Sequence, residues 1–333
     1  MRVALVTTWG IACGIAEHSA LLVEALQQAD PSIAVEIVSD LHPQAILGRR
    51  EAPAQTAVDL VVLNYQAALH SQWTPGAITA VKQTLGVPVV VVYHDTGVPN
   101  SEQCQGIAAA ADAMIIHEPA EDLPGRVEYW RMGVPPWPAG DYAWGRETWW
   151  KAYPDQPVLG SVGFPFPWKN YTELARIAGE VGWACHLLAP QATTAQITEW
   201  QALNPHTRVE SAFLPRAEVI RKLAACDATA FLYTCANTGQ SGAVLQGIAA
   251  RKPVFAFESC RQFRALYADP LANKYVRWCT SFAQFQERLA NTILGRVDCG
   301  MVALAEQESW ARLGRKYAAL FHALAADPAD LIV

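Results

Sequence analysis

Short apolar runs alternate with helix-like stretches along most of this chain, and no other feature constrains its fold as strongly. The run 89–93, for example, is strand-length and is followed by a stretch that favours a helix. Short runs of this kind, bounded by turn residues and separated by helices, are typical of parallel βαβ units. The sequence therefore predicts an α/β fold built on parallel sheets.

The alternation occurs twice along the 333 residues. In the first half, strands are predicted at 3–7, 34–38, 60–63, 89–93 and 113–116, with helices at 15–28, 77–85 and 101–110. In the second half, strands are predicted at 158–162, 184–188, 209–213, 228–232 and 254–257, with helices at 171–181, 194–203, 217–225 and 241–250. Further helices finish the chain, the last at 309–324. Two such halves in series predict a cleft between them, lined by the carboxyl ends of the strands.

The stretch 133–153 interrupts the alternation. Its prolines at 135, 136 and 138 cannot continue a helix or a central strand, because proline fixes φ and lacks an N–H donor. We therefore place the linker between the two domains here.

Composition excludes several classes of protein. Hydrophobic residues make up 52% of the chain and charged residues 17%, which indicates a globular protein. A net charge of −6 argues against binding to a phosphate backbone, so we expect no nucleic-acid partner. The eight cysteines contain no CxxC pair and are interpreted as reduced thiols in a cytoplasmic protein.

Membrane insertion is also not expected. The first residues do not resemble a secretory signal, and the apolar runs are far shorter than the roughly 20 residues that a membrane helix needs. The stretch 144–153 is amphipathic but short, so peripheral contact with a membrane stays open.

Two loops of the first half are candidates for chemistry. Gly10 and Gly14 lie between the first strand and the first helix, where glycine lets the backbone approach a ligand and directs helix amides at an anion. This spacing is not GxGxxG, and a tight turn without a ligand is the alternative. His94 and Asp95 follow the strand 89–93, where they could donate, accept or orient a proton. His117 follows the next strand as a weaker candidate.

Two loops of the second half suit a phosphate. Lys169 comes after a strand and before a helix, so it could bind phosphate charge together with the helix N-terminus; a solvated lysine is the alternative. The second loop places backbone amides and a hydroxyl at a helix start, which suits a diphosphate or a sugar; an ordinary N-capped helix is the alternative. Its residues are Thr238, Gly239, Gln240, Ser241 and Gly242.

Taken together, these motifs resemble the GT-B glycosyltransferases, specifically retaining family 4. The resemblance spans nearly the whole chain. It is carried by Cys13-Gly14-Ile15-Ala16, Tyr93-His94-Asp95, Gly163 with Lys169, the stretch 245–254, and Ser309-Trp310 with Tyr317.

The resemblance implies two Rossmann-like domains that face each other across a cleft. Residues 1–137 would form the acceptor domain, 138–308 the nucleotide-sugar domain, and 309–333 a C-terminal helix that crosses back to the first domain. His94 would then contact the transferring sugar, with Asp95 beside it. The donor would be held by Gly10, Gly14, Lys169, Thr238, Gly239, Gln240, Ser241, Gly242 and Gln246.

The chain departs from the family pattern at three positions. The two family glutamates map onto Thr238 and Gln246, and the diphosphate arginine maps onto Phe164. The Gln246 amide can hydrogen-bond a ribose hydroxyl, although a carboxylate accepts more strongly. Donor preference is therefore not carried over from the family.

The function expected from the resemblance is transfer of a hexose, with retention, from a UDP- or GDP-linked sugar to a hydroxyl acceptor. The acceptor would be a saccharide, a glycolipid or a small molecule. The sequence contains no Asp-x-Asp motif, so we expect no cofactor and no essential metal at the diphosphate. The alternatives are a catalytically impaired relative that binds a nucleotide sugar or a partner, and an epimerase or phosphorylase of the same architecture.

Overall fold

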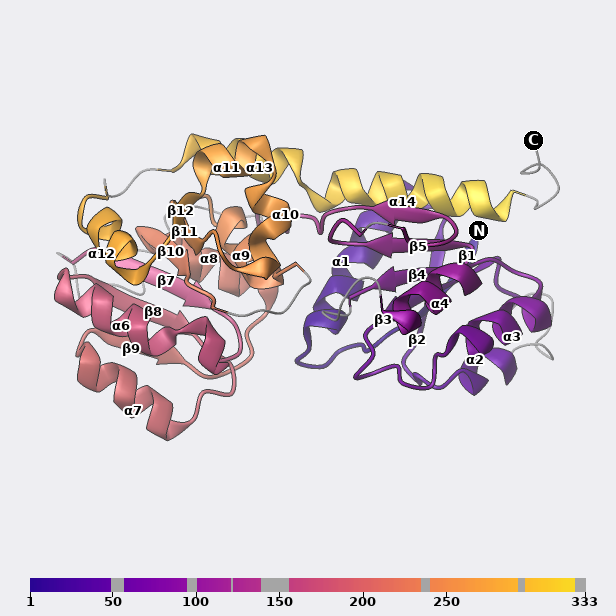
Figure 1. Cartoon of the computed structure of the whole chain (residues 1–333), viewed down its shortest axis with the longest axis horizontal. Helices are drawn as coiled ribbons and strands as arrows, with labels where there is room; N and C mark the ends of the chain where they lie inside the picture. Colours follow the sequence, from indigo (N-terminus) through magenta and orange to yellow (C-terminus); the bar gives the residue numbers. More distant parts are fainter. Residues whose placement is uncertain are drawn as a thin grey trace. The chain divides into compact units, whose positions relative to one another are not determined.

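The structure is a computed structural model that describes residues 1–48, 57–94, 101–120, 122–138, 156–234, 240–292 and 297–326. The chain divides into two compact units (Figure 1). Unit 1 comprises Met1–Gly133, Asn237–Gln240 and Trp310–Val333, and unit 2 comprises Val134–Ala236 and Ser241–Ser309.

Unit 1 contains a six-stranded sheet in which all paired strands are parallel. Its strands lie in the order β2 (Ala34–Val38), β1 (Arg2–Val6), β3 (Leu60–Tyr65), β4 (Val89–Tyr93), β5 (Ala113–Ile116) and β6 (Val127–Tyr129). The first five occupy the predicted apolar runs to within two residues. The sequence did not predict β6, because this edge strand has three residues and is not apolar throughout.

The two faces of this sheet are buried by different helices. Residues of β1, β3 and β4 alternate between two apolar clusters, since successive side chains of a strand point to opposite faces. One cluster includes side chains of α1 (Gly14–Ala29) and α14 (Trp310–Ala325). The other includes side chains of α2 (Gln44–Leu47), α3 (Pro75–Leu85) and α4 (Glu102–Ala110).

Unit 2 repeats this architecture with a second six-stranded parallel sheet. Its strands lie in the order β12 (Arg277–Cys279), β11 (Val254–Phe257), β10 (Ala228–Phe231), β7 (Val158–Val162), β8 (Ala184–Leu188) and β9 (Thr207–Glu210). The prediction of a strand at 209–213 was wrong in its bounds. Pairing of β9 stops at Glu210 because its partner residue, Leu188, is the last residue of β8.

Helices pack around the second sheet. They are η3 (Pro167–Lys169), α6 (Tyr171–Glu180), α7 (Thr194–Leu203), α8 (Arg216–Ala225), α9 (Gly242–Ala249), η4 (Arg261–Phe263), α10 (Arg264–Tyr267), α11 (Pro270–Tyr275), α12 (Phe282–Ala290) and α13 (Cys299–Gln307). Among the described residues, no helix combines the length and the apolar character that crossing a membrane requires.

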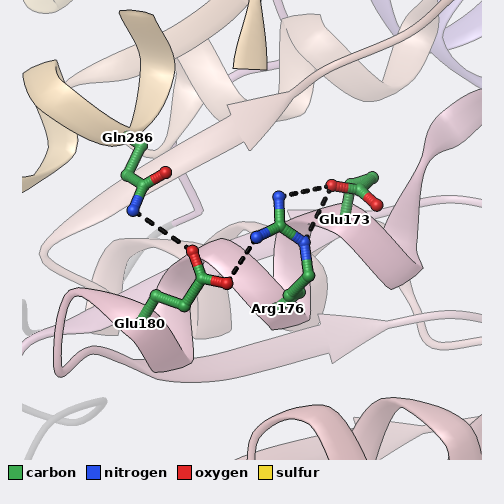
Figure 2. Close-up of polar contacts among 4 residues, drawn as sticks. All are labelled: Glu173, Arg176, Glu180 and Gln286. Atoms are coloured by element: carbon green, nitrogen blue, oxygen red, sulfur yellow. Dashed lines mark hydrogen bonds and ion pairs between the residues drawn. The ribbon is translucent and has the colours of Figure 1, made fainter. Parts of the chain in front are cut away.

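A polar network on the surface of unit 2 connects α6 to α12 (Figure 2). Arg176 bonds Glu173 at 2.7 Å and also pairs with Glu180, which accepts a hydrogen bond from Gln286 of α12. The Arg176 and Glu180 side chains are 36% and 43% exposed, and exposed ion pairs of this kind contribute about 1 kcal/mol or less. We therefore interpret this network as a helix–helix contact and not as a site.

The contact between α1 and α14 depends on Gly314. A Cβ at this position would collide with the backbone carbonyl of Ala25, so the two helices approach at a point where only glycine fits. We expect Gly314→Ala to lower the free energy of unfolding by about 1–3 kcal/mol, measured by urea denaturation. The matched control is Gly76→Ala in α3, where an added Cβ meets only an ordinary contact to Thr74. Equal stability of the two variants would contradict this role of Gly314.

Candidate functional site

Four polar side chains of unit 1 meet near the carboxyl ends of its parallel strands. His94 follows β4 directly, His117 follows β5, and Asn64 is the last residue but one of β3. His18 lies in α1, four residues after the helix begins at Gly14. Because the carboxyl ends of parallel strands lie at one edge of the sheet, these residues from separate parts of the chain form one cluster.

The three imidazole rings are in mutual contact. The ring centroids lie 4.3 Å apart for His18 and His94, 4.8 Å for His94 and His117, and 5.5 Å for His18 and His117. The edge of the Trp310 indole packs on His18 at 4.9 Å. His18 and His117 are only 2% and 3% exposed. We call His18, His94 and His117 the histidine cluster.

Asn64 is the hydrogen-bonding centre beside the histidine cluster. Its Oδ1 accepts a short hydrogen bond from His94 Nε2, and its Nδ2 lies 3.3 Å from His18 Nδ1. The same Nδ2 donates to Ser19 Oγ at 2.5 Å. On the other side of the cluster, His117 Nδ1 donates to the Trp130 carbonyl at 2.7 Å. These bonds fix the orientation of the rings.

Burial keeps the histidine cluster neutral at neutral pH. Removal from water lowers the pKa of His18 and of His94 well below 6.5, and the neighbouring rings lower both further. Burial also lowers the pKa of His117 to about 4, although the hydrogen bond to the Trp130 carbonyl opposes this shift. The cluster therefore presents imidazole donors and lone pairs instead of positive charges.

The other residues predicted in unit 1 have different surroundings. Gly10 is exposed with a φ of +67°, and Gly14 is exposed at the first position of α1, so the backbone of this loop is accessible. Gln240 Oε1 accepts from the Met132 amide at 2.6 Å, while its Nε2 is buried without a hydrogen-bond partner among the described residues. Asp95, Thr238 and Gly239 lie outside the described residues.

Unit 2 holds a buried lysine beside a glycine. Lys169 at the end of η3 is 7% exposed, and its Nζ lies 5.4 Å from the Trp168 ring centroid and 5.2 Å from that of Tyr233. Gly163 follows β7 with a φ of +125°, and a Cβ there would collide with this ammonium group. Lys169 is therefore not the solvated surface lysine of the alternative interpretation.

The start of α9 lies close to this lysine. The Cβ of Ala243, in the first turn, would be in ordinary contact with a Cβ on Gly163. Ser241 is the N-cap residue of α9, and its side chain makes no capping hydrogen bond. Gly242 is exposed at the first position of α9, and Gln246 is half-buried one turn further on. The Lys169 ammonium group and the first turn of α9 therefore both lie beside Gly163, at the carboxyl end of β7.

Phe164, at the position of the family arginine, belongs to a row of aromatic rings. Its centroid lies 6.2 Å from Phe213 and 6.1 Å from Phe166, whose ring stacks on Trp168 at 5.5 Å. Phe166 and Phe213 are 50% and 47% exposed. This row of rings, of which Phe166 and Phe213 are exposed, was not predicted, although the spacing of 164, 166 and 168 in one loop could have indicated it.

Sequence reasoning also missed His18 and Asn64. His18 lies in the helix predicted at 15–28. Its place in the cluster depends on contacts with strands that are far away in the sequence. Asn64 had a local signal, because it is a polar residue that extends the apolar run at 60–63 toward the end of the strand.

No family model matches the chain, and no curated protein matches its sequence. Solved structures do match its fold. The HepE protein (Alr3699) of Anabaena, in complex with UDP and glucose, aligns with a TM-score of 0.69 at 14% identity over 97% of this chain and 100% of its own. AviGT4, a glycosyltransferase involved in avilamycin A biosynthesis, aligns with a TM-score of 0.60 at 16% identity over 98% of both chains.

A third structure, the lipopolysaccharide outer core galactosyltransferase WaaB, aligns with a TM-score of 0.59 at 11% identity over 97% of this chain and 100% of its own. These structural neighbours are GT-B glycosyltransferases. The chain has their fold. The predicted α/β class with two domains, each built on a parallel sheet, is confirmed.

The histidine cluster predicts a loss of stability in mild acid. His117 keeps its neutral form down to a pKa of about 4 when folded, whereas an unfolded histidine takes up a proton near pH 6.5. Its contribution is therefore complete above pH 6.5 and is lost as the pH falls toward 4. We expect this residue alone to lower the free energy of unfolding by about 2 kcal/mol between pH 7.5 and 5.

Urea denaturation at the two pH values measures this change, and His117→Asn is the comparison. The variant should be less stable at pH 7.5 but should lose less stability on acidification than the wild type. The same pH dependence in both proteins would show that His117 is not held neutral by burial.

Proposed function

We propose that this protein is a metal-independent retaining glycosyltransferase of family 4 type. It would move a hexose from a UDP- or GDP-linked sugar to a hydroxyl of a saccharide, glycolipid or small molecule. Two solved neighbours support the donor class, because the Anabaena HepE structures contain UDP with glucose in one case and UDP-glucose in the other. We further propose that it acts in the cytoplasm.

The observation that carries the proposal is the position of Lys169. Its ammonium group is buried against aromatic faces, lies beside a glycine that leaves room for it, and is close to the first turn of α9. A lysine and helix amides in one place suit the negative charge that develops on a departing diphosphate. In this proposal, Lys169 and the amides of Ser241 and Gly242 bind the diphosphate, and Gln246 binds the ribose.

Unit 1 supplies the remaining contacts in the proposal. His94 contacts the transferring sugar, and the accessible backbone at Gly10 and Gly14 approaches the diphosphate or the acceptor. Gln240 offers a buried Nε2 without a partner among the described residues, and a donor left in this way is commonly satisfied by a ligand or water. Asp95, Thr238 and Gly239 are assigned to the same site through the family resemblance alone.

No cofactor other than the donor is required in this mechanism. The charge on the leaving diphosphate is stabilised by Lys169 and by backbone amides, so no metal ion bridges the two phosphates. We propose residues 1–137 as the acceptor domain and 138–308 as the donor domain, with 309–333 returning to the first.

A second candidate is a relative that binds a nucleotide sugar or a partner protein without turnover. It is favoured by the aromatic row at Phe164, which replaces a charged contact to the diphosphate with apolar rings. Product analysis separates the candidates, with UDP- and GDP-sugars incubated with an acceptor panel. A glycoside that keeps the donor's anomeric configuration supports transfer, and nucleotide binding without any product supports the second candidate. An isomerised nucleotide sugar would instead indicate an epimerase.

The first test of the donor site is calorimetric titration with UDP, GDP and ADP in metal-free buffer. We expect one nucleotide to bind and Lys169→Ala to weaken its affinity by about tenfold or more, since a charge-assisted contact is lost. Lys274→Ala, in exposed α11 of the same unit, is the matched control and should bind normally. Unchanged affinity in Lys169→Ala would remove Lys169 from the site. Absence of nucleotide binding to the wild type would favour the partner-binding candidate.

A second test uses the glycine beside the lysine. Gly163→Ala should displace the Lys169 ammonium and reduce nucleotide affinity, while straining a backbone with a φ of +125°. Gly182→Ala is matched to it, because Gly182 also has a positive φ of +76° but has open space around it. Both variants should lose stability, and only Gly163→Ala should lose nucleotide affinity. A similar loss of affinity in both would attribute the effect to backbone strain.

A further inference from the structure

The histidine cluster brings one ring nitrogen from each of three side chains into one small space. These nitrogen atoms of His18, His94 and His117 all lie within 4.8 Å of one another. In a tetrahedral zinc site, ligand nitrogens lie 2.0–2.1 Å from the ion and so about 3.4 Å from each other. A modest inward movement of the rings would give three bonds to one ion.

Two of the ring nitrogens are buried and have no hydrogen-bond partner among the described residues. They are His18 Nε2 and His117 Nε2, which belong to residues that are only 2% and 3% exposed. A buried polar atom left unsatisfied costs about 1–3 kcal/mol, so such atoms usually contact a water or an ion. Two of them on adjacent rings indicate a common ligand between the rings.

The hydrogen bonds on the far sides of the His94 and His117 rings determine which ring nitrogen keeps a lone pair for a metal. The Trp130 carbonyl can only accept, so His117 carries its proton on Nδ1 and has a lone pair on Nε2. In the same way, His94 Nε2 donates to Asn64 Oδ1, which leaves the lone pair on Nδ1. A histidine whose second nitrogen donates to a carbonyl is the usual arrangement of a metal ligand.

His18 needs one change of proton position. Its Nδ1 lies 3.3 Å from the Asn64 amide nitrogen, so this contact is given up when the proton moves to Nδ1 and Nε2 becomes the ligand atom. Asn64 keeps its shorter bond to Ser19 Oγ, at 2.5 Å. The exchange gives up one long hydrogen bond and leaves two N–H donors facing each other, a cost that the metal–nitrogen bond has to exceed.

From this geometry we propose that His18, His94 and His117 bind one divalent transition-metal ion of the zinc type. Three imidazoles suit zinc, nickel, cobalt or copper and not magnesium or calcium, which prefer oxygen. The edge of Trp310 packs against His18 and limits water on that side. His94 is half-buried, and the fourth coordination position is placed on its open side.

The three proposed ligands are not among the residues assigned to the diphosphate, so the proposal does not conflict with transfer that needs no metal. One consequence rests on the proposed function. If His94 contacts the transferring sugar, a bound ion occupies that histidine and inhibits transfer. The binding of the ion is independent of this consequence and is tested without nucleotide or acceptor.

The experiment uses the full chain after treatment with EDTA and removal of the chelator. Co²⁺ is titrated first, because tetrahedral coordination gives strong visible absorption, and Zn²⁺ is then added to displace it. We expect saturation at about one ion per chain, and at least about 100-fold weaker binding in His18→Ala and in His117→Ala. His186→Ala is the matched control, because His186 is equally buried in unit 2 but bonds Glu210 through Nε2.

A measurement on the wild-type protein tests the proposal even if the variants fail to fold. X-ray absorption of the zinc-loaded wild type should show three imidazole nitrogens at about 2.0 Å. Absence of saturable binding to the wild type would overturn the proposal. So would thiolate ligands in the absorption spectrum, or folded His18→Ala and His117→Ala variants that bind as well as His186→Ala.

Discussion

In unit 1, successive residues of the central strands alternate between two apolar clusters, so neither face of the sheet can accept a polar side chain without a cost. Polar groups are therefore confined to the ends of the strands, where the chain leaves the sheet. The histidine cluster and Asn64 occupy that edge. In unit 2, Lys169 and Gly163 lie beyond the carboxyl end of β7, but buried polar side chains such as His186 and Thr229 also occur within its strands.

Ionisable side chains are buried at the carboxyl-end edges of both sheets, but they are stabilised there in different ways. In unit 1, the rings lose their charge, because burial lowers the histidine pKa values far enough for neutral imidazole to persist. In unit 2, a lysine ammonium group lies near the faces of Trp168 and Tyr233, which attract a cation. A neutral edge suits hydroxyl groups or a metal ion, whereas a cationic edge suits phosphate.

The sequence predicted those elements whose signal is local. The apolar runs at 89–93, 113–116 and 254–257 became strands with the predicted bounds, because an apolar run of strand length buries both its faces. β6 and β12 were missed because each has only three residues, too few to show a periodicity. The end of β9 was misplaced because it is set by the length of β8, its partner strand. His94 and Lys169 were found from their places after strands. His18 and Asn64 were not, because their role arises only when β3, β4 and α1 meet.

In the proposed donor site of unit 2, Phe164 stands where the family resemblance places an arginine. With an aromatic ring in place of arginine, this loop contributes the single charge of Lys169, and Phe164 lies in a row of rings that is partly exposed. The remaining stabilisation of a diphosphate would have to come from uncharged groups, among them the first amides of α9. Amide dipoles are held in place by the helix and need no reorganisation as charge develops on the leaving group. Without an arginine, the attraction for the bound donor is therefore reduced more than the stabilisation of that developing charge. We therefore expect weak donor affinity to be compatible with transfer.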